Sequence, residues 1–302
     1  MANIKGRLLD PDAEILPPSN DKIFKVLFTH PDANQVLIDI ISAVIGKKVT
    51  NVQIRNVELP VMNIDEKNQR FDVNCSIENG DQIDVEMHST QIYETGIERK
   101  NFLNKYTYFL TDLHSSQKSC SVEYEDLVRT YQIIFTSHFV FKKRKDFINW
   151  FSLRDKEGKQ LTDQVNMIFI ELCKLNDIIN KPVEELTSFE KWLLFLRFAP
   201  DPMQRTKIND IIKEKEEIGM AAAILQEISQ DERQKALIRS QKMYEMDMYS
   251  NEKTLEKIGE IRERKKWKGV VKNQKAEITK QKAELADQKA EIARLRAELE
   301  KR

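Results

Sequence analysis

Three side chains that could bind a metal or move a proton lie close together between residues 71 and 89. Asp72 opens a short alternating run, and Glu86 and His88 end the run that follows a glycine-centred turn. Two such runs around a turn predict a β-hairpin. Because strand side chains alternate between faces, Glu86 and His88 share a face with Asp84, and we expect that face to line a cleft that Asp72 also reaches.

These side-chain types are typical of metal-assisted hydrolysis. Carboxylate oxygens are the ligands that hard divalent cations prefer, so we expect Asp72 and Glu86 to bind Mg²⁺ or Mn²⁺, with the backbone carbonyl of Met87 as a third ligand. The cation would lower the pKa of a bound water and neutralise charge on a phosphate. His88 would orient that water or contact the phosphate. Taken alone, the pattern also fits an ordinary hairpin with a polar solvent face.

The segments around the hairpin predict a mixed α/β domain. Apolar residues at helical spacing predict helices over residues 21–28, 32–45 and 91–115. Runs rich in β-branched and aromatic residues predict strands over residues 49–59, 128–141, 147–153 and 165–172. We therefore expect an α/β fold with a central mixed sheet flanked by helices. Further amphipathic segments predict helices over residues 184–197, 208–229 and 231–249, and the last two of these are rich in charged residues.

A seven-residue repeat occupies the C-terminal end of the chain. Its apolar residues are Ile278, Leu285, Ile292 and Leu299. With these at heptad position a, every position g is glutamate and the e positions are Lys282, Lys289 and Arg296. Glutamates at g pair with e cations of a second chain in a parallel two-stranded coiled coil, so we expect a homodimer. The alternative is a single solvated helix stabilised by its own salt bridges.

These patterns divide the chain into four segments. We expect a lead-in over residues 1–18, the α/β domain over residues 19–200, a helical region over residues 201–268 and the coiled-coil tail over residues 269–302.

The charge balance argues against a generally basic nucleic-acid coat. Lys plus Arg and Asp plus Glu are equal, at 49 each, so the formal net charge is zero. Two local basic runs could still hold a DNA backbone. They are Lys142, Lys143, Arg144 and Lys145, and Lys265, Lys266 and Lys268 beside Trp267. Each run also fits an ordinary solvated surface.

The location of the protein is predicted from what its sequence lacks. The three cysteines are widely separated and none is at metal-ligand spacing, which favours reduced thiols. No secretory signal and no run of about 18 apolar residues is visible. We therefore expect a cytoplasmic protein that has no membrane partner.

The order of several motifs resembles the recombination-promoting nuclease/transposase family of the PD-(D/E)XK nuclease superfamily. The residues that carry the resemblance are, in chain order, Asp21, Phe24, Lys25 and Phe28 in a D-x-x-F-K-x-x-F pattern, Asp72, the Glu86-Met87-His88 element, Arg99, Tyr106 with Tyr108, Leu161-Thr162-Asp163 and the Ile168–Leu172 run. The resemblance covers roughly residues 15–200 and keeps its order throughout.

The resemblance implies a restriction-endonuclease-like core and a metal-dependent DNA endonuclease linked to recombination or transposition. It carries Asp72 and Glu86 over as metal ligands. Asp21 would be an acid beside the metal, or alternatively the N-cap of its helix. Arg99 would contact phosphate, or alternatively be solvated.

His88 departs from the family pattern, which usually has glutamine there, while the wider superfamily has lysine. All three side chains can hydrogen-bond a water or a phosphate. The departure leaves an alternative function open. In that alternative the fold is catalytically degenerate and acts as a DNA-binding or protein-interaction module with a dimerising coiled coil.

Overall fold

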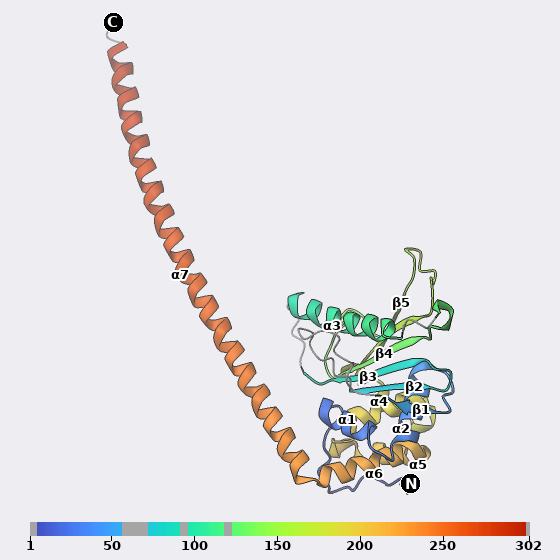
Figure 1. The fold of residues 1–302 in the computed structure, drawn as a ribbon. Helices are drawn as coiled ribbons and strands as arrows, with labels where there is room; N and C mark the ends of the chain where they lie inside the picture. Colours follow the sequence, from blue (N-terminus) through green and yellow to red (C-terminus); the bar gives the residue numbers. More distant parts are fainter. Residues whose placement is uncertain (1–4, 56–71, 91–95, 118–122, 300–302) are drawn as a thin grey trace, which may run out of the picture. The chain divides into compact units, whose positions relative to one another are not determined.

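The computed structural model describes residues 5–55, 72–90, 96–117 and 123–299. The chain forms two compact units, residues 1–235 and residues 236–302. The first unit contains the sheet, and the second belongs to a long helix (Figure 1). No helix in the described ranges is both long enough and apolar enough to cross a membrane.

A six-stranded mixed sheet forms the centre of the first unit, as predicted. Its strands are β1 (Val52–Ile54), β2 (Val73–Ile77), β3 (Gln82–His88), β4 (Thr130–Thr136), β5 (Ile148–Ser152) and β6 (Val165–Glu171). Their order across the sheet is β1-β2-β3-β4-β6-β5. β2 and β3 form the predicted antiparallel hairpin. β3, β4 and β6 run parallel, so the ends of β3 and β4 that carry His88 and Thr136 lie at one edge.

Helices cover the two faces of this sheet. They are α1 (Asp21–Phe28), α2 (Asn34–Ile45), α3 (Gly96–Ser115), α4 (Ser188–Phe198), α5 (Arg205–Glu214) and α6 (Glu216–Gln230). α3 lies alone on one face, and α1, α2 and α4 lie on the other, with α5 and α6 beneath them (Figure 1). α6 packs on α1 and α2, and α5 packs on α4. The fold is therefore a restriction-endonuclease-like α/β sandwich, with α3 over the face that carries the predicted site.

The start of α1 is set by a side-chain cap. Asn20 accepts hydrogen bonds from the backbone N–H groups of Lys22 and Ile23, which would otherwise lack partners. The apolar side of the helix then buries Phe24, whose ring centroid lies 5.7 Å from that of Phe135 on β4. The N-cap of α1 is therefore Asn20 and not Asp21.

The core between α3 and the sheet is aromatic. It contains Phe102, Tyr106, Leu110, Ile134, Val140, Met167 and Phe169. Burying an aromatic side chain of this size contributes roughly 2–3 kcal/mol, so α3 is held firmly over the middle of the sheet. The polar side chains of β2 and β3 that share this face lie beside that core, where water has little access.

Strand β4 is shorter than its sequence predicts, because it ends at Thr136 rather than near residue 141. The following segment leaves the sheet and finds a different hydrogen-bond acceptor. The backbone N–H groups of Val140 and Phe141 both donate to the buried carboxylate of Glu171, at 2.6 and 3.0 Å. Val140 is therefore buried beside this carboxylate without a strand partner, whereas Phe139 is exposed.

The helices of the second half also differ from the prediction. The helix expected over residues 208–229 is two helices, because Lys215 is extended (φ −138°, ψ 105°) and separates α5 from α6. The helix expected over residues 231–249 continues without interruption as α7 (Glu232–Leu299). Of the strand expected over residues 49–59, the structure shows Val52–Ile54 as β1. Residues 56–59 lie outside the described residues.

The segments predicted to flank the α/β domain pack closely with it. The backbone N–H of Leu9 donates to Asn209 Oδ1 at 2.9 Å, and that of Leu16 donates to Ser229 Oγ at 2.9 Å. The lead-in thus runs along α5 and α6, and all three belong to the first compact unit.

Candidate active site

Asp72 and Glu86 meet where β2 and β3 begin and end. The backbone N–H of Asp72 donates to Glu86 Oε1, and the backbone N–H of Met87 donates to Asp72 Oδ2, each at 3.0 Å. Each carboxylate therefore accepts a hydrogen bond from a backbone N–H on the opposite side of the hairpin. These two hydrogen bonds hold Asp72 and Glu86 next to each other. Glu86 is only 5% exposed, while Asp72 is half-buried. The structure brings together the two residues that the sequence predicts as metal ligands.

The electrostatics of this pair favour a bound cation. Burial and the nearby Asp72 charge raise the pKa of Glu86 to about 8. Burial also raises the pKa of Asp72, against the lowering effect of the Met87 N–H and of Lys25. Two carboxyl groups in one desolvated place resist ionisation unless a positive charge compensates them. A divalent cation is the compensation that such a pair supplies ligands for.

A third carboxylate lies deeper than the sequence predicts. Asp84 shares the face of Glu86, yet it is fully buried and does not line a cleft. Its Oδ2 accepts from Gln132 Nε2 at 3.2 Å, and Asn74 lies opposite it on β2. Burial, followed by the Glu86 charge, raises the pKa of Asp84 well above its usual range. The polar face therefore continues inward from the Asp72–Glu86 pair.

Several acceptors in this buried row lack a hydrogen-bond partner within the described residues. They are Asn74 Oδ1, Asp84 Oδ1 and Gln132 Oε1. Buried acceptors of this kind are costly unless a donor, a water or a cation reaches them. In the described ranges, no group of three or more His, Cys, Asp or Glu side chains could hold a metal ion. A cation here would thus rest on two carboxylates, with water or backbone oxygen completing its shell.

His88 is close to the pair but is uncharged at neutral pH. Burial, assisted by the charges of Lys105 and His138, lowers its pKa to about 4. The imidazole centroid lies 4.8 Å from that of Phe102, so the ring packs under α3. His88 can therefore accept or donate one hydrogen bond, but it does not replace the positive charge of the superfamily lysine.

Two lysines that the sequence analysis did not assign to the site act on it electrostatically. Both Lys25 on α1 and Lys105 on α3 lower the pKa of Glu86 and of Asp72. Lys105 Nζ lies 4.9 Å from the ring centroid of Tyr106. Lys25 was visible as the lysine of the D-x-x-F-K-x-x-F pattern, whereas Lys105 has no distinguishing signal in the sequence.

Asp21 ties α1 to the end of β3. Ser89 Oγ donates to Asp21 Oδ1 at 3.3 Å. The Asp21 charge raises the pKa of Asp72, which places it electrostatically beside the pair. His138 reaches the same region, because its Nε2 lies 2.9 Å from the Ser89 carbonyl oxygen.

Arg99 already has a structural partner. Its Nε donates to the carbonyl oxygen of Val140 at 2.8 Å, and its guanidinium carbon lies 5.3 Å from the Phe141 ring centroid. Together with Glu171, it fixes the segment that precedes the basic run. The predicted phosphate contact of Arg99 stays a prediction.

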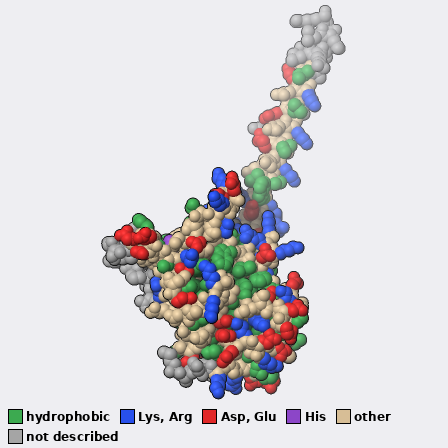
Figure 2. All heavy atoms as spheres, turned by 90° about the vertical axis from the view of Figure 1, so that its right-hand side faces the viewer, with side chains coloured by type: hydrophobic (Ala, Val, Ile, Leu, Met, Phe, Trp, Pro, Cys, Tyr) green, Lys and Arg blue, Asp and Glu red, His purple; other side chains and the backbone are tan. Residues whose placement is uncertain are grey.

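The first basic run is exposed but held at its base. Arg144 donates to Asn149 Oδ1 at 3.0 Å, and Lys142, Lys143 and Lys145 are exposed. The second run lies on α7 in the other compact unit, where Lys266 and Lys268 are exposed. Basic and acidic side chains alternate over the globular face shown in Figure 2, so on that face any DNA contact depends on such local runs.

The comparisons with known proteins give one match. The sequence pattern of a family described as PD-(D/E)XK nuclease family transposase matches residues 18–255. The match contains α1, the β2–β3 hairpin with Asp72 and Glu86, and α3 with Arg99. Searches of curated proteins and of solved structures returned no match. Because the family pattern covers well over half of the chain, the protein belongs to the PD-(D/E)XK nuclease family transposases.

Proposed function

We propose that this protein is a divalent-metal-dependent endonuclease that hydrolyses DNA phosphodiester bonds in recombination or transposition. Asp72 and Glu86 hold Mg²⁺ or Mn²⁺, with the Met87 carbonyl as a further oxygen ligand. When bound, the cation supplies an activated water and neutralises charge on the phosphate. The proposal rests on the pairing of Asp72 and Glu86. Their carboxylates accept hydrogen bonds from the backbone N–H groups of Met87 and Asp72, and the pKa of each carboxyl group is raised.

The protein's own side chains then act around that pair. His88, neutral at pH 7, orients the attacking water through one ring nitrogen. Lys25 and Lys105 bring positive charge toward the carboxylates and help to balance the phosphate. Asp21, which accepts a hydrogen bond from Ser89 Oγ, is the acid beside the metal.

The partners follow from the surface and from α7. The Lys142–Lys145 run and the Lys265, Lys266 and Lys268 run hold the DNA backbone, and Arg99 adds a phosphate contact beside the site. A parallel coiled coil over the C-terminal heptads joins two chains, which puts two active sites in one particle. Such a homodimer suits double-strand cleavage. The protein acts in the cytoplasm.

A second function is favoured by one observation. An uncharged imidazole stands where the superfamily has lysine, and His88 keeps its neutral form above a pH of about 4. A site without that charge fits a catalytically degenerate fold that binds DNA or a protein partner through the basic runs and α7.

Plasmid nicking separates the two functions. The full chain is incubated with supercoiled plasmid in Mg²⁺, in Mn²⁺ and in chelator, beside Asp72→Asn and Glu86→Gln. We expect metal-dependent nicking that each substitution lowers at least 100-fold, because each removes a charged metal ligand. Glu185→Gln, an exposed carboxylate on a different surface, should leave nicking unchanged. Absence of nicking in the parent, or equal nicking in parent and variants, would favour the degenerate module.

A further inference from the structure

The heptad stripe of α7 continues upstream of the repeat that is visible in the sequence. A shallow groove on this helix is lined by Arg264, Trp267, Lys268, Val271 and Lys275. Extending the heptad of Ile278 backward puts Val271 and Arg264 at position a, Trp267 at position d, and both lysines at position e. All the lining residues therefore belong to the same seam.

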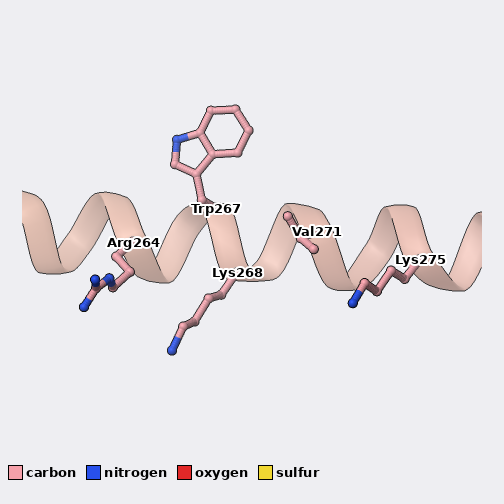
Figure 3. Close-up of a pocket in the computed structure, with 5 residues that line it drawn as sticks. All are labelled: Arg264, Trp267, Lys268, Val271 and Lys275. Carbon is pink, nitrogen blue, oxygen red and sulfur yellow. The ribbon is translucent and has the colours of Figure 1, made fainter.

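The apolar side chains along this seam are exposed on the single chain. Trp267 is 60% exposed and Val271 44%, and Ile278, Leu285 and Ile292 are each 51–52% exposed. Figure 3 shows Val271 between Trp267, which projects to one side of the helix, and the cations Arg264, Lys268 and Lys275, which project to the other. From Val271 onward the a positions are apolar, with Trp267 at the preceding d position and glutamine at the next three d positions. Apolar a positions bordered by charged side chains are the form of a helix–helix interface.

The charges beside the stripe identify what covers it. In a parallel pair of helices, position g of one chain faces position e five residues later in the other. The exposed glutamates at g are Glu277 and Glu284, and the matching cations are Lys282 and Lys289. The same spacing joins Glu263 to Lys268, whereas the g position between them and the repeat is Val270, opposite Lys275. A complementary charge pair therefore recurs at the upstream end of the apolar stripe. Figure 2 shows acidic and basic side chains on opposite borders of the outer part of this helix.

An antiparallel pair would place glutamates against glutamates and lysines against lysines. A nucleic acid would use the lysines but would leave the aliphatic a residues and the g glutamates without a counterpart. Only a second copy of this chain in parallel register satisfies both borders and the stripe between them.

We propose that residues 264–271 are part of the interface with a second, parallel copy of this chain, and that Trp267 packs in that interface instead of stacking on nucleic acid. This inference rests on the homodimer proposed above and moves the start of its coiled coil from residue 269 to residue 264. It assigns Lys268 to the interface instead of to DNA. Arg262 and Lys266, at positions f and c on the opposite side of the helix, still face outward for DNA.

Substitution of Trp267 distinguishes a protein seam from a nucleic-acid contact. Sedimentation equilibrium of the full chain gives the dimer dissociation constant, and the salt dependence of DNA binding is measured in parallel. We expect Trp267→Ala to raise that constant at least tenfold and Trp267→Leu to change it less than threefold. A coiled-coil interface requires a large apolar side chain at position d, and leucine supplies one without an aromatic ring. Asn273→Ala, at position c, should leave it unchanged.

A cysteine pair tests the register. In a chain with Cys120 and Cys173 replaced by serine, Val271→Cys should oxidise to a disulfide-linked dimer, because a-position Cβ atoms of a parallel pair lie within disulfide reach. Asn273→Cys, at the outward-facing position c, should form no disulfide-linked dimer under the same oxidation.

Three outcomes would overturn the inference. A dimeric parent whose dissociation constant is unaffected by Trp267→Ala places the seam further downstream and leaves the proposed homodimer intact. Loss of DNA binding in both Trp267 variants, with dimerisation unchanged, assigns the ring to nucleic acid. A parent that is monomeric at all concentrations removes both the homodimer and its extension, while plasmid nicking still tests the nuclease separately.

Discussion

The chemistry of the candidate site depends on how deeply two carboxyl groups are buried. Glu86 is buried on the face of the sheet under α3, near both Asp84 and Asp72. Its ionised carboxylate would therefore be poorly solvated and close to two other acidic groups. Such groups titrate together and far from their usual range. A protein keeps an arrangement of this cost where it serves a function, most often catalysis or metal binding.

The first prediction concerns metal affinity. The pKa of Glu86 is about 8 without metal, so metal binding at lower pH must displace a proton. We expect the apparent Mn²⁺ affinity to fall by about tenfold for each pH unit below 8, as one proton is released. Calorimetric titrations at pH 6, 7 and 8, each in two buffers of different ionisation enthalpy, measure affinity and proton release together. An affinity that is flat across this range would contradict the prediction.

The second prediction concerns stability without metal. The pKa of Glu86 is raised from 4.5 in the unfolded chain to about 8 in the folded one. Its contribution to stability is therefore fully present below about pH 4.5 and is lost as pH rises through about 8. Glu86→Gln keeps the oxygen that accepts the Asp72 N–H and removes the titration. We expect it to stabilise the metal-free protein by on the order of 2 kcal/mol at pH 8.

Urea unfolding in chelator at pH 4.5 and pH 8 measures this difference. The gain from Glu86→Gln should shrink toward zero at the lower pH, and Glu185→Gln should show no gain at either. A destabilising effect of Glu86→Gln at pH 8 would contradict the burial argument.

At the scale of elements, the segment after β4 is held by side chains where sequence predicts a strand. Glu171 is fully buried and accepts from Val140, Phe141 and Asn149, and also from Lys174 Nζ at 2.5 Å. One carboxylate thus replaces the missing strand partner. This anchor sets where the following basic run emerges from the fold.

The third prediction tests this anchor. Glu171→Ala leaves the backbone N–H groups of Val140 and Phe141 without their acceptor. It also removes the negative charge beside the buried Lys174 ammonium, which keeps only carbonyl oxygens as acceptors. We expect it to cost about 3–5 kcal/mol, as breaking a buried ion pair does. Glu185→Ala, which removes an exposed carboxylate, should stay within about 0.5 kcal/mol of the parent. Chemical denaturation measures both. A loss below about 1 kcal/mol for Glu171→Ala would mean that the aromatic contacts of Phe141 hold the segment by themselves.

At the scale of the whole molecule, α7 differs from every other helix. Many of its described side chains beyond residue 255 are exposed, the apolar Ile261, Trp267 and Ile278 among them. A helix of this length and composition gains little from its own packing in a single chain. We therefore expect its stability to depend on the proposed pairing with a second copy of the chain.

The fourth prediction separates the two units. A chain ending at residue 255 keeps the whole region that matches the family and loses the heptads. We expect it to be monomeric, to unfold cooperatively, and to keep metal-dependent nicking at a rate below that of the parent, because it also loses the Lys265, Lys266 and Lys268 run proposed to hold the DNA backbone. The ratio of linear to nicked plasmid should fall, because two active sites are no longer joined in one dimer. Sedimentation and product analysis on gels test this, and an unchanged ratio would show that cleavage does not need the dimer.

The sequence by itself determined what depends on local pattern. Apolar spacing predicted α1, α2 and α3, and alternation predicted the β2–β3 hairpin, and the structure confirms these elements. The charge pairing that the heptads predict for the tail stays a prediction. The sequence also put Asp72, Glu86 and His88 on one hairpin, since strand side chains alternate strictly. The order of those motifs was enough to point to the family.

Only the tertiary structure decided the environments of these residues. Asp84 has the same alternation as Glu86, but its burial depends on α3 and on Gln132 from β4, which are distant in sequence. His88 is neutral because Phe102 covers it and Lys105 lies nearby. The strand expected up to residue 141 stops at Thr136. The backbone N–H groups of Val140 and Phe141 donate instead to Glu171, about thirty residues further along the chain. Desolvation and competition for hydrogen bonds arise between elements, so no local pattern contains them.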